Sequence, residues 1–94
     1  MRIVVTITAR QELQEHIAYI ADQDPEAAQR QYDRILEAVD ALQDYPRRGR
    51  PGRVEGTREL VISGTSYVAI YEVGTDVVTI VHIIHGRQQW PREQ

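Results

Sequence analysis

Three histidines, His16, His82 and His85, are the side chains of this 94-residue chain best suited to acid–base or metal chemistry, since it contains no cysteine. His82 and His85 stand three residues apart in a predicted strand, so their side chains point to opposite faces and cannot bind one metal ion together. His16 lies among charged residues of a predicted helix, where we expect it to be solvated. Ser63 and Ser66 flank a predicted turn without a histidine and acid pattern nearby, which gives no support to a hydrolase triad. The sequence therefore predicts no metal site and no cofactor.

Arginine supplies all eleven basic side chains, and five of them lie between residues 46 and 58. These are Arg47, Arg48, Arg50, Arg53 and Arg58, against the single acid Glu55. The loop arginines are either solvated or placed to meet phosphates or the carboxylates of a partner, and Arg58 serves either a target or a structural ion pair. Residues 9–45 carry nine acids against three arginines, and the net charge is −3. This balance argues against broad nucleic-acid affinity, and we expect no direct sequence-specific binding of nucleic acid.

The segment that follows the last predicted strand carries Arg87, Gln88 and Trp90, the only tryptophan of the chain. Trp90 either docks back on its own domain or anchors a partner protein. Tryptophan and arginine are both over-represented among the residues that dominate interface energies. We therefore expect Arg87, Gln88 and Trp90, together with Arg58, to contact a target.

The composition is that of one globular domain, which we expect to span residues 1–94, because 41% of the residues are hydrophobic. No apolar run approaches the ~18 residues needed to cross a bilayer, so we expect no membrane association. The opening residues, MRIVVTITAR, make a poor signal peptide, which predicts a cytoplasmic protein.

The elements that must position these residues begin with a β-branched run over 2–7, which predicts a strand. Thr8 is a predicted N-cap with Gln11 at capping-box spacing, followed by a helix over 9–23. Asp24-Pro25-Glu26 predicts the start of a second helix that ends before Pro46. Apolar residues recur along it at helical spacing and predict a buried stripe of Ala28, Tyr32, Ile35, Val39 and Leu42.

After a loop over 47–56, three strands are predicted at 57–63, 66–73 and 77–85, joined by short turns into an antiparallel meander. The third strand is almost wholly apolar and should be central. The predicted fold class is α+β, with a helical hairpin packed on a small twisted antiparallel sheet in the order β-α-α-β-β-β. The other face of the sheet is where a ligand or partner would bind.

Several short motifs, in their order and spacing, resemble the RelE/ParE superfamily of toxins from bacterial type II toxin–antitoxin modules, and more closely its ParE branch. The resemblance covers nearly the whole chain. The motifs are Ala9–Leu13, Ile17–Ile20, Asp24-Pro25 with Ala27-Ala28, Leu42 followed by Pro46–Arg50, Gly56–Leu60, Tyr67–Tyr71 and His85–Pro91.

The resemblance implies a toxin neutralised by a cognate antitoxin, and it leaves two mechanisms open. RelE-like members cut messenger RNA on the ribosome, whereas ParE-like members poison DNA gyrase. RelE-like nucleases place an arginine directly after the tyrosine that opens the second meander strand, and this chain has Val68 there and no lysine anywhere. His85 and Arg87 are the catalytic candidates only if the chain is RelE-like.

The sequence thus favours a ParE-like gyrase inhibitor that acts by protein–protein contact. The first alternative is a RelE-like ribosome-dependent endoribonuclease, and the second is a non-toxic antitoxin-binding regulator of its operon. We expect an antitoxin tail to cross the helical hairpin and reach the sheet, where its acids meet Arg47, Arg48, Arg50 or Arg87.

Overall fold

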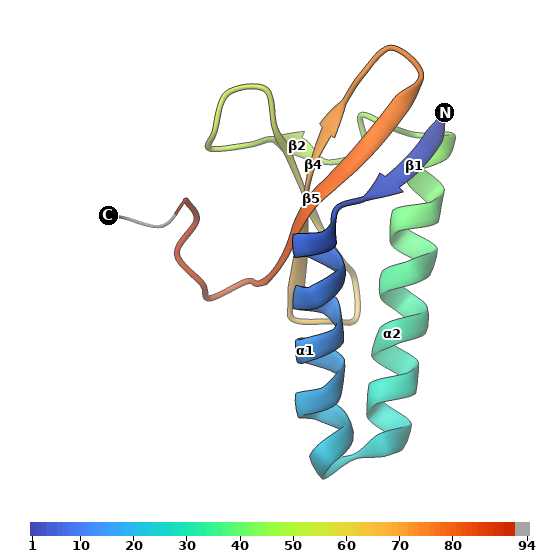
Figure 1. Ribbon diagram of the computed structural model, residues 1–94, viewed down its shortest axis with the longest axis vertical. Coiled ribbons are helices and arrows are strands. Elements are labelled where there is room, and N and C mark those ends of the chain that lie inside the picture. Colours follow the sequence, from blue (N-terminus) through green and yellow to red (C-terminus); the bar gives the residue numbers. More distant parts are fainter. Residues whose placement is uncertain (92–94) are drawn as a thin grey trace.

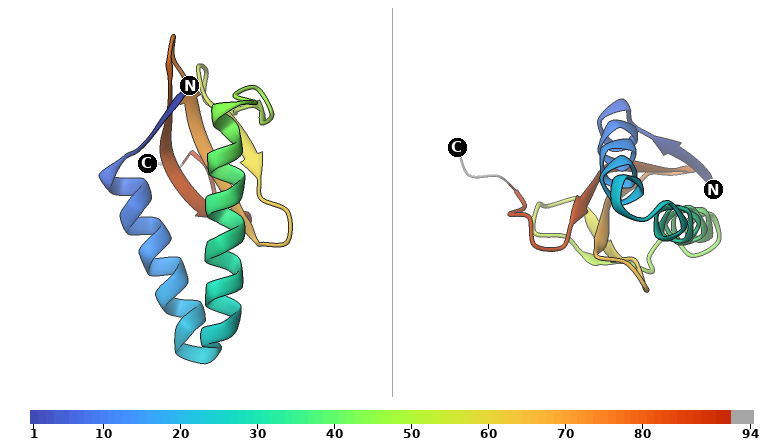
Figure 2. Two further views of the ribbon diagram at one scale, coloured as in Figure 1. Left: turned by 90° about the vertical axis from the view of Figure 1, so that its right-hand side faces the viewer. Right: turned by 90° about the horizontal axis from the view of Figure 1, so that it is seen from below.

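A computed structural model of the chain describes residues 1–91. It has two helices that form an antiparallel hairpin against one face of a five-stranded sheet (Figures 1 and 2). The predicted α+β class and the helical hairpin are therefore confirmed. No helix in this part of the chain is both long and apolar enough to cross a bilayer.

The first strand and helix meet at Thr6, not at Thr8 as predicted. Strand β1 is Arg2–Val5 and helix α1 is Ile7–Gln23. The Thr6 hydroxyl accepts the Ala9 N–H at 3.1 Å and donates to the Val81 carbonyl at 3.2 Å, which uses both hydrogen-bonding roles of a hydroxyl. Of the two threonines, Thr6 is the cap because it also bonds to β5, which Thr8 does not. The predicted capping box of Thr8 with Gln11 therefore does not form.

Helix α2, Pro25–Asp40, begins as predicted, because Asp24 accepts the Ala27 N–H at 3.1 Å. A short 3₁₀ turn, Ala41–Gln43, ends it before Pro46. The predicted stripe is buried except at Tyr32, which is 37% exposed. Tyr32 lines the groove between α1 and α2.

The sheet has the order β1-β5-β4-β3-β2, with the apolar strand β5 inside it as predicted. Strands β3 (Arg58–Val61), β4 (Tyr67–Val73) and β5 (Val77–His85) form the predicted antiparallel meander. The sheet is mixed rather than purely antiparallel, because β1 pairs parallel with β5. A two-residue strand β2, Arg50–Pro51, pairs with β3 inside the region predicted to be loop.

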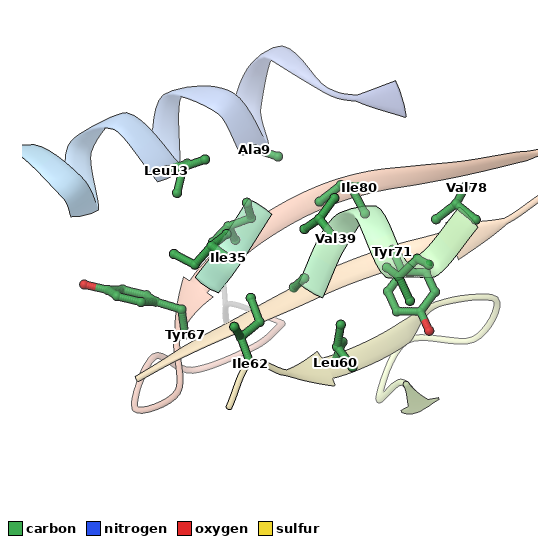
Figure 3. Close-up of a cluster of buried hydrophobic side chains, with 13 residues drawn as sticks. Ala9, Leu13, Ile35, Val39, Leu60, Ile62, Tyr67, Tyr71, Val78 and Ile80 are labelled. Carbon is green, nitrogen blue, oxygen red and sulfur yellow. The ribbon is translucent and has the colours of Figure 1, made fainter. Parts of the chain in front are cut away.

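Two apolar clusters lie on opposite faces of the sheet. The larger fills the space beneath the helices, where Figure 3 shows Ile35, Val39 and Ile80 together. The smaller lies on the open face, away from the helices, and consists of Val68, Ile70 and Ile84 with Val81 and Trp90 packed against them. A bulge in the β4–β5 pairing leaves Val81 without a partner residue and re-aims the end of β5.

Candidate functional site

The candidate site is the end of β5 together with the segment that follows it. Strand β1 pairs with β5 only as far as Ile80, which leaves the edge of β5 beyond it without a neighbouring strand. Instead of a strand, three side chains bond to this part of β5, one from Thr6 and two from α1. Thr6 donates to the Val81 carbonyl, Glu12 accepts the Ile83 N–H at 3.1 Å, and His16 bonds the Ile83 carbonyl at 2.9 Å. These bonds fasten α1 to the exact stretch of β5 that carries the site.

His16 is therefore half-buried and bonded, and the expectation that it is solvated is wrong. A carbonyl oxygen can only accept, so Nε2 of His16 carries the proton. Its ring lies 4.6 Å from the ring of Tyr67, and the ring of His85 meets Tyr67 edge-on at 5.6 Å. Burial and the neighbouring Tyr19 phenol raise the pKa of Tyr67. These aromatic rings close the helix-side core at this end of the sheet.

His82 faces the opposite way and links α1 to Trp90. Its Nδ1 lies 3.1 and 3.2 Å from the two carboxylate oxygens of Glu12, and Nδ1 donates to them because carboxylate oxygens accept. Its ring lies 4.6 Å from the Trp90 ring at an interplanar angle of 57°. The predicted opposite orientation of His82 and His85 is confirmed, since one contacts Trp90 on the open face and the other Tyr67 beneath the helices.

The segment after β5 forms a tight turn on the strand end. The Gly86 N–H donates to the Ser66 carbonyl at 2.7 Å, and the Gln88 N–H donates to the His85 carbonyl at 2.9 Å. In return the Gln88 side-chain oxygen accepts the His85 N–H at 2.6 Å, and Nδ1 of His85 accepts the Arg87 N–H at 3.1 Å. The Nδ1 lone pair of His85 is thus used to hold the turn.

Arg53 approaches the same segment from the β2–β3 loop. Its guanidinium donates to the Trp90 carbonyl at 3.2 Å, while its backbone N–H donates to Glu59 at 3.0 Å. Glu59 is 4% exposed and also pairs with Arg50 at 3.1 Å. Burial by itself raises the pKa of Glu59, but the Arg53 N–H and the Arg50 guanidinium outweigh it and hold that pKa below its ordinary value. The buried, ionised carboxylate of Glu59 therefore holds the β2–β3 loop in the position from which Arg53 binds the Trp90 carbonyl.

A hollow of about 460 Å³ lies between the start of α1 and this segment. Glu12, His82, Gln88 and Trp90 are among the residues that line it. A second hollow, of about 390 Å³, is the apolar groove between the two helices, lined by Leu13, Ile17, Ala18, Tyr32 and Leu36 among others. The hollow at the C-terminal segment is thus lined by both polar and apolar side chains, whereas the groove on the hairpin is mainly apolar.

The structure separates the predicted site residues into two groups. Arg87, Gln88 and Trp90 lie together, with Arg87 and Gln88 exposed and Trp90 half-buried. Arg58 lies elsewhere. It pairs with Tyr71 on β4, whereas His85 pairs with Tyr67, which is four residues or ~13 Å away along the same strand. Its guanidinium donates to the Gly49 and Arg47 carbonyls, which ties it to the loop.

The remaining loop arginines differ in their surroundings. Arg47 and Arg48 are exposed, and the Arg48 guanidinium lies 5.1 Å from the centre of the Tyr45 ring. Arg50 is held by Glu59. Glu12 and His82 were not predicted as site residues, and neither was the contact of Arg53 with Trp90. The i, i+4 spacing of Glu12 and His16 was the available signal, since it places both on one face of α1.

Comparisons with known proteins identify the family to which this fold belongs. The family model described as the ParE toxin of the type II toxin–antitoxin system parDE matches residues 3–90. The chain belongs to this family, and the resemblance drawn from its motifs is confirmed. It is a toxin of the type II toxin–antitoxin class, in the RelE/ParE superfamily.

Relatives of the chain carry toxin names, and one of them is a RelE toxin. Y4kP of Sinorhizobium fredii, which carries the name of a toxin, is 47% identical over 91 residues, or 97% of this chain and 94% of the relative. Toxin RelE2 of Caulobacter vibrioides is 43% identical over 68 residues, or 72% of this chain and 75% of the relative.

Two solved structures share the fold. A structure of the chromosomal ParDE toxin–antitoxin system from P. aeruginosa has a TM-score of 0.83 at 26% identity, covering 90% of this chain and 95% of that one. The RelBE2 toxin–antitoxin complex from Mycobacterium tuberculosis has a TM-score of 0.59 at 21% identity, covering 89% and 95%, and it shows the fold alone.

Proposed function

We propose that this toxin inhibits DNA gyrase by protein–protein contact through its C-terminal segment, and that a cognate antitoxin neutralises it. The observation that carries this proposal is the open face of the sheet. Its centre is apolar, formed by Val68, Ile70 and Ile84, and Trp90 packs against it. Cleavage of RNA requires a proton donor, a proton acceptor and cations around one phosphate, whereas the centre of this face holds three apolar side chains that are themselves buried.

The position of His85 also favours the gyrase proposal over the RelE-like alternative. The His85 ring contacts Tyr67 on the helix side, whereas Arg50 and Arg53 are joined to Glu59 and Trp90 on the open face. The one imidazole suggested for acid–base work therefore does not converge with these cations. Arg87 is close to His85, but its backbone N–H, rather than its guanidinium, makes the contact.

A pair of assays on the purified toxin distinguishes the proposed target from the alternatives. Gyrase is assayed for supercoiling and for trapped DNA cleavage, and a translation reaction is assayed for cut messenger RNA. Inhibition of gyrase with intact messenger RNA is the expected result. Cleaved messenger RNA with unaffected gyrase would identify the nuclease alternative, and a toxin inactive in both assays and in growing cells would support the operon regulator.

Antitoxin binding is supported by the apolar groove between α1 and α2, whose size suits one face of an amphipathic helix. We expect the antitoxin to lay a helix in this groove and to bring its acids to Arg47 and Arg48, which are exposed and form no ion pair with residues 1–91. Arg50 and Arg87 were predicted contacts too. Amide exchange with and without antitoxin tests this, and unchanged exchange along both helices and the sheet would refute it.

A further inference from the structure

The segment that begins at Gly86 is fixed at both ends and exposed between them. Its start is hydrogen-bonded to Ser66 and to the end of β5. Its end is held at Trp90, whose carbonyl binds Arg53 and whose ring packs on His82. The three residues between, Arg87, Gln88 and Gln89, are all exposed, and we name them the tip. An exposed stretch between two fixed points is ordered before it binds, which lowers the entropy cost of association.

We propose that Trp90 is the internal anchor of this segment, and that Glu12, His82 and Arg53 position it so that the tip binds an acidic protein surface. This rests on the proposed function only for the identity of that surface, which would belong to gyrase. The role of Trp90 is then to hold the tip in place, and direct contact with the target falls to residues 87–89.

The burial of Trp90 supports an internal role. Its ring packs on the Val68, Ile70 and Ile84 cluster, and His82 lies against it. The indole Nε1 is buried too and has no hydrogen-bond partner among residues 1–91, so the ring is held by packing and not by its polar edge. A residue that inserts into a pocket of a partner needs a free ring, whereas this ring already fills a place on its own sheet.

Glu12 and His82 form a rigid support for that ring. The Glu12 carboxylate accepts from the His82 imidazole and from the Ile83 N–H, so its position is set by the backbone of β5 as well as by α1. His82 is thereby held in one orientation with its ring against Trp90. Arg53 fixes the Trp90 carbonyl from the other side, and its own backbone is held by the buried Glu59.

The chemistry of the tip suits carboxylates. Arg87 contributes a guanidinium that forms no ion pair with residues 1–91. Gln88 turns its carbonyl oxygen inwards to the His85 N–H, which leaves its NH₂ group as the free donor. A single guanidinium flanked by amide donors fits a carboxylate on a protein surface. It is too little positive charge for a phosphate backbone on a chain of net charge −3.

The experiment separates anchoring from contact in the full-length toxin. Trp90→Ala, Trp90→Phe, His82→Ala and Arg87→Ala are compared, and Glu15→Ala is the control, because Glu15 is an exposed acid on the same helix as Glu12 and makes none of the contacts that hold Trp90. Amide exchange at Gly86 and Gln88, Trp90 fluorescence, growth arrest in cells and affinity for purified gyrase are measured. Binding to antitoxin confirms that each variant is folded.

If Trp90 is an anchor, Trp90→Ala and His82→Ala lose amide protection at Gly86 and Gln88 together with growth arrest. His82→Ala also shifts the Trp90 emission to the red, while Trp90→Phe and Glu15→Ala keep both protection and arrest. Arg87→Ala keeps protection and loses about thirtyfold in target affinity, the loss typical of a truncated interface anchor.

Three results would overturn the proposal. The first is Trp90→Ala with full protection and no growth arrest, which would make Trp90 a direct contact. The second is Arg87→Ala with undiminished arrest. The third is binding of a duplex oligonucleotide by the toxin alone that depends on Arg87. If wild type arrests growth without affecting gyrase, the gyrase proposal fails, while protection and arrest still decide the role of Trp90.

Discussion

The Glu12 carboxylate and the His82 imidazole, 70 residues apart in the sequence, meet at 3.1 Å between α1 and β5. The same carboxylate accepts the Ile83 N–H, which no neighbouring strand reaches on that edge. One side chain therefore completes the sheet, joins it to the hairpin and orients the imidazole that supports Trp90. This couples the stability of the domain to the position of its C-terminal segment.

Glu12→Ala should destabilise the domain by ~1–3 kcal/mol, because it leaves the Ile83 N–H and the His82 Nδ1 without their acceptor. Glu12→Gln should cost less, since its amide oxygen still accepts one of these bonds. Urea unfolding of both variants measures the difference. An Ala variant as stable as wild type would show that the carboxylate contributes no net stability.

Ile35→Ala should abolish growth arrest through loss of the fold. Ile35 is fully buried beneath the hairpin, and truncating such a residue costs ~2–5 kcal/mol of the ~5–15 kcal/mol that stabilises a domain. Tyr32→Ala, on the same helix but partly exposed, is the control and should melt closer to wild type. An Ile35→Ala protein that melts like wild type yet is inactive would contradict this structural role.

Tyr71→Phe should cost ~1–3 kcal/mol, although it removes one oxygen atom. The buried phenol donates to the Pro46 carbonyl and accepts the Gly49 N–H, both at 2.8 Å, so its loss leaves two loop groups unsatisfied. Gly49→Ala should damage the same contact, because an added Cβ would lie 2.7 Å from the phenol oxygen. Thermal unfolding measures both, and wild-type melting of either would refute the packing of Tyr71 against this loop.

Glu59 should make the domain less stable in acid. Its pKa in the folded protein is lowered from the ordinary 4.5, so its stabilising effect is complete above that value and is lost as the pH falls through the folded pKa. Glu59→Gln should therefore be less stable than wild type at neutral pH, and the gap should narrow in acid. Urea midpoints at pH 7 and at pH 3 test the sign, which is wrong if the gap widens in acid.

Much of the fold could be predicted because its signals are local. Asp24 before Pro25 fixes the start of α2, and the apolar run Val77–His85 gives β5 its observed bounds. The start of α1 could not be predicted, because Thr6 and Thr8 are equally good caps and only the contact of Thr6 with Val81 decides between them. Strand β2 depends in the same way on pairing with Glu59.

Residues of the candidate site could be predicted from the sequence, but the contacts that hold them in place could not. Composition and residue type indicated Arg87 and Trp90, which do lie together. Their supports, His82 with Glu12 and Arg53 with the Trp90 carbonyl, are contacts between segments 37 to 70 residues apart. Each of these side chains is unremarkable in its local sequence, so only the folded chain reveals the connection.

The comparison of His85→Asn with Arg87→Ala in growing cells tests most directly whether this toxin acts by contact or by proton transfer. Asparagine at position 85 still offers an acceptor to the Arg87 N–H, but it cannot act as a general acid or base. Contact with gyrase predicts that His85→Asn still arrests growth and that Arg87→Ala does not, with both variants folded and bound by antitoxin. An inactive His85→Asn, with the ~10²–10⁴-fold loss of rate typical of a missing general acid or base, beside a fully active Arg87→Ala would contradict it and identify a nuclease.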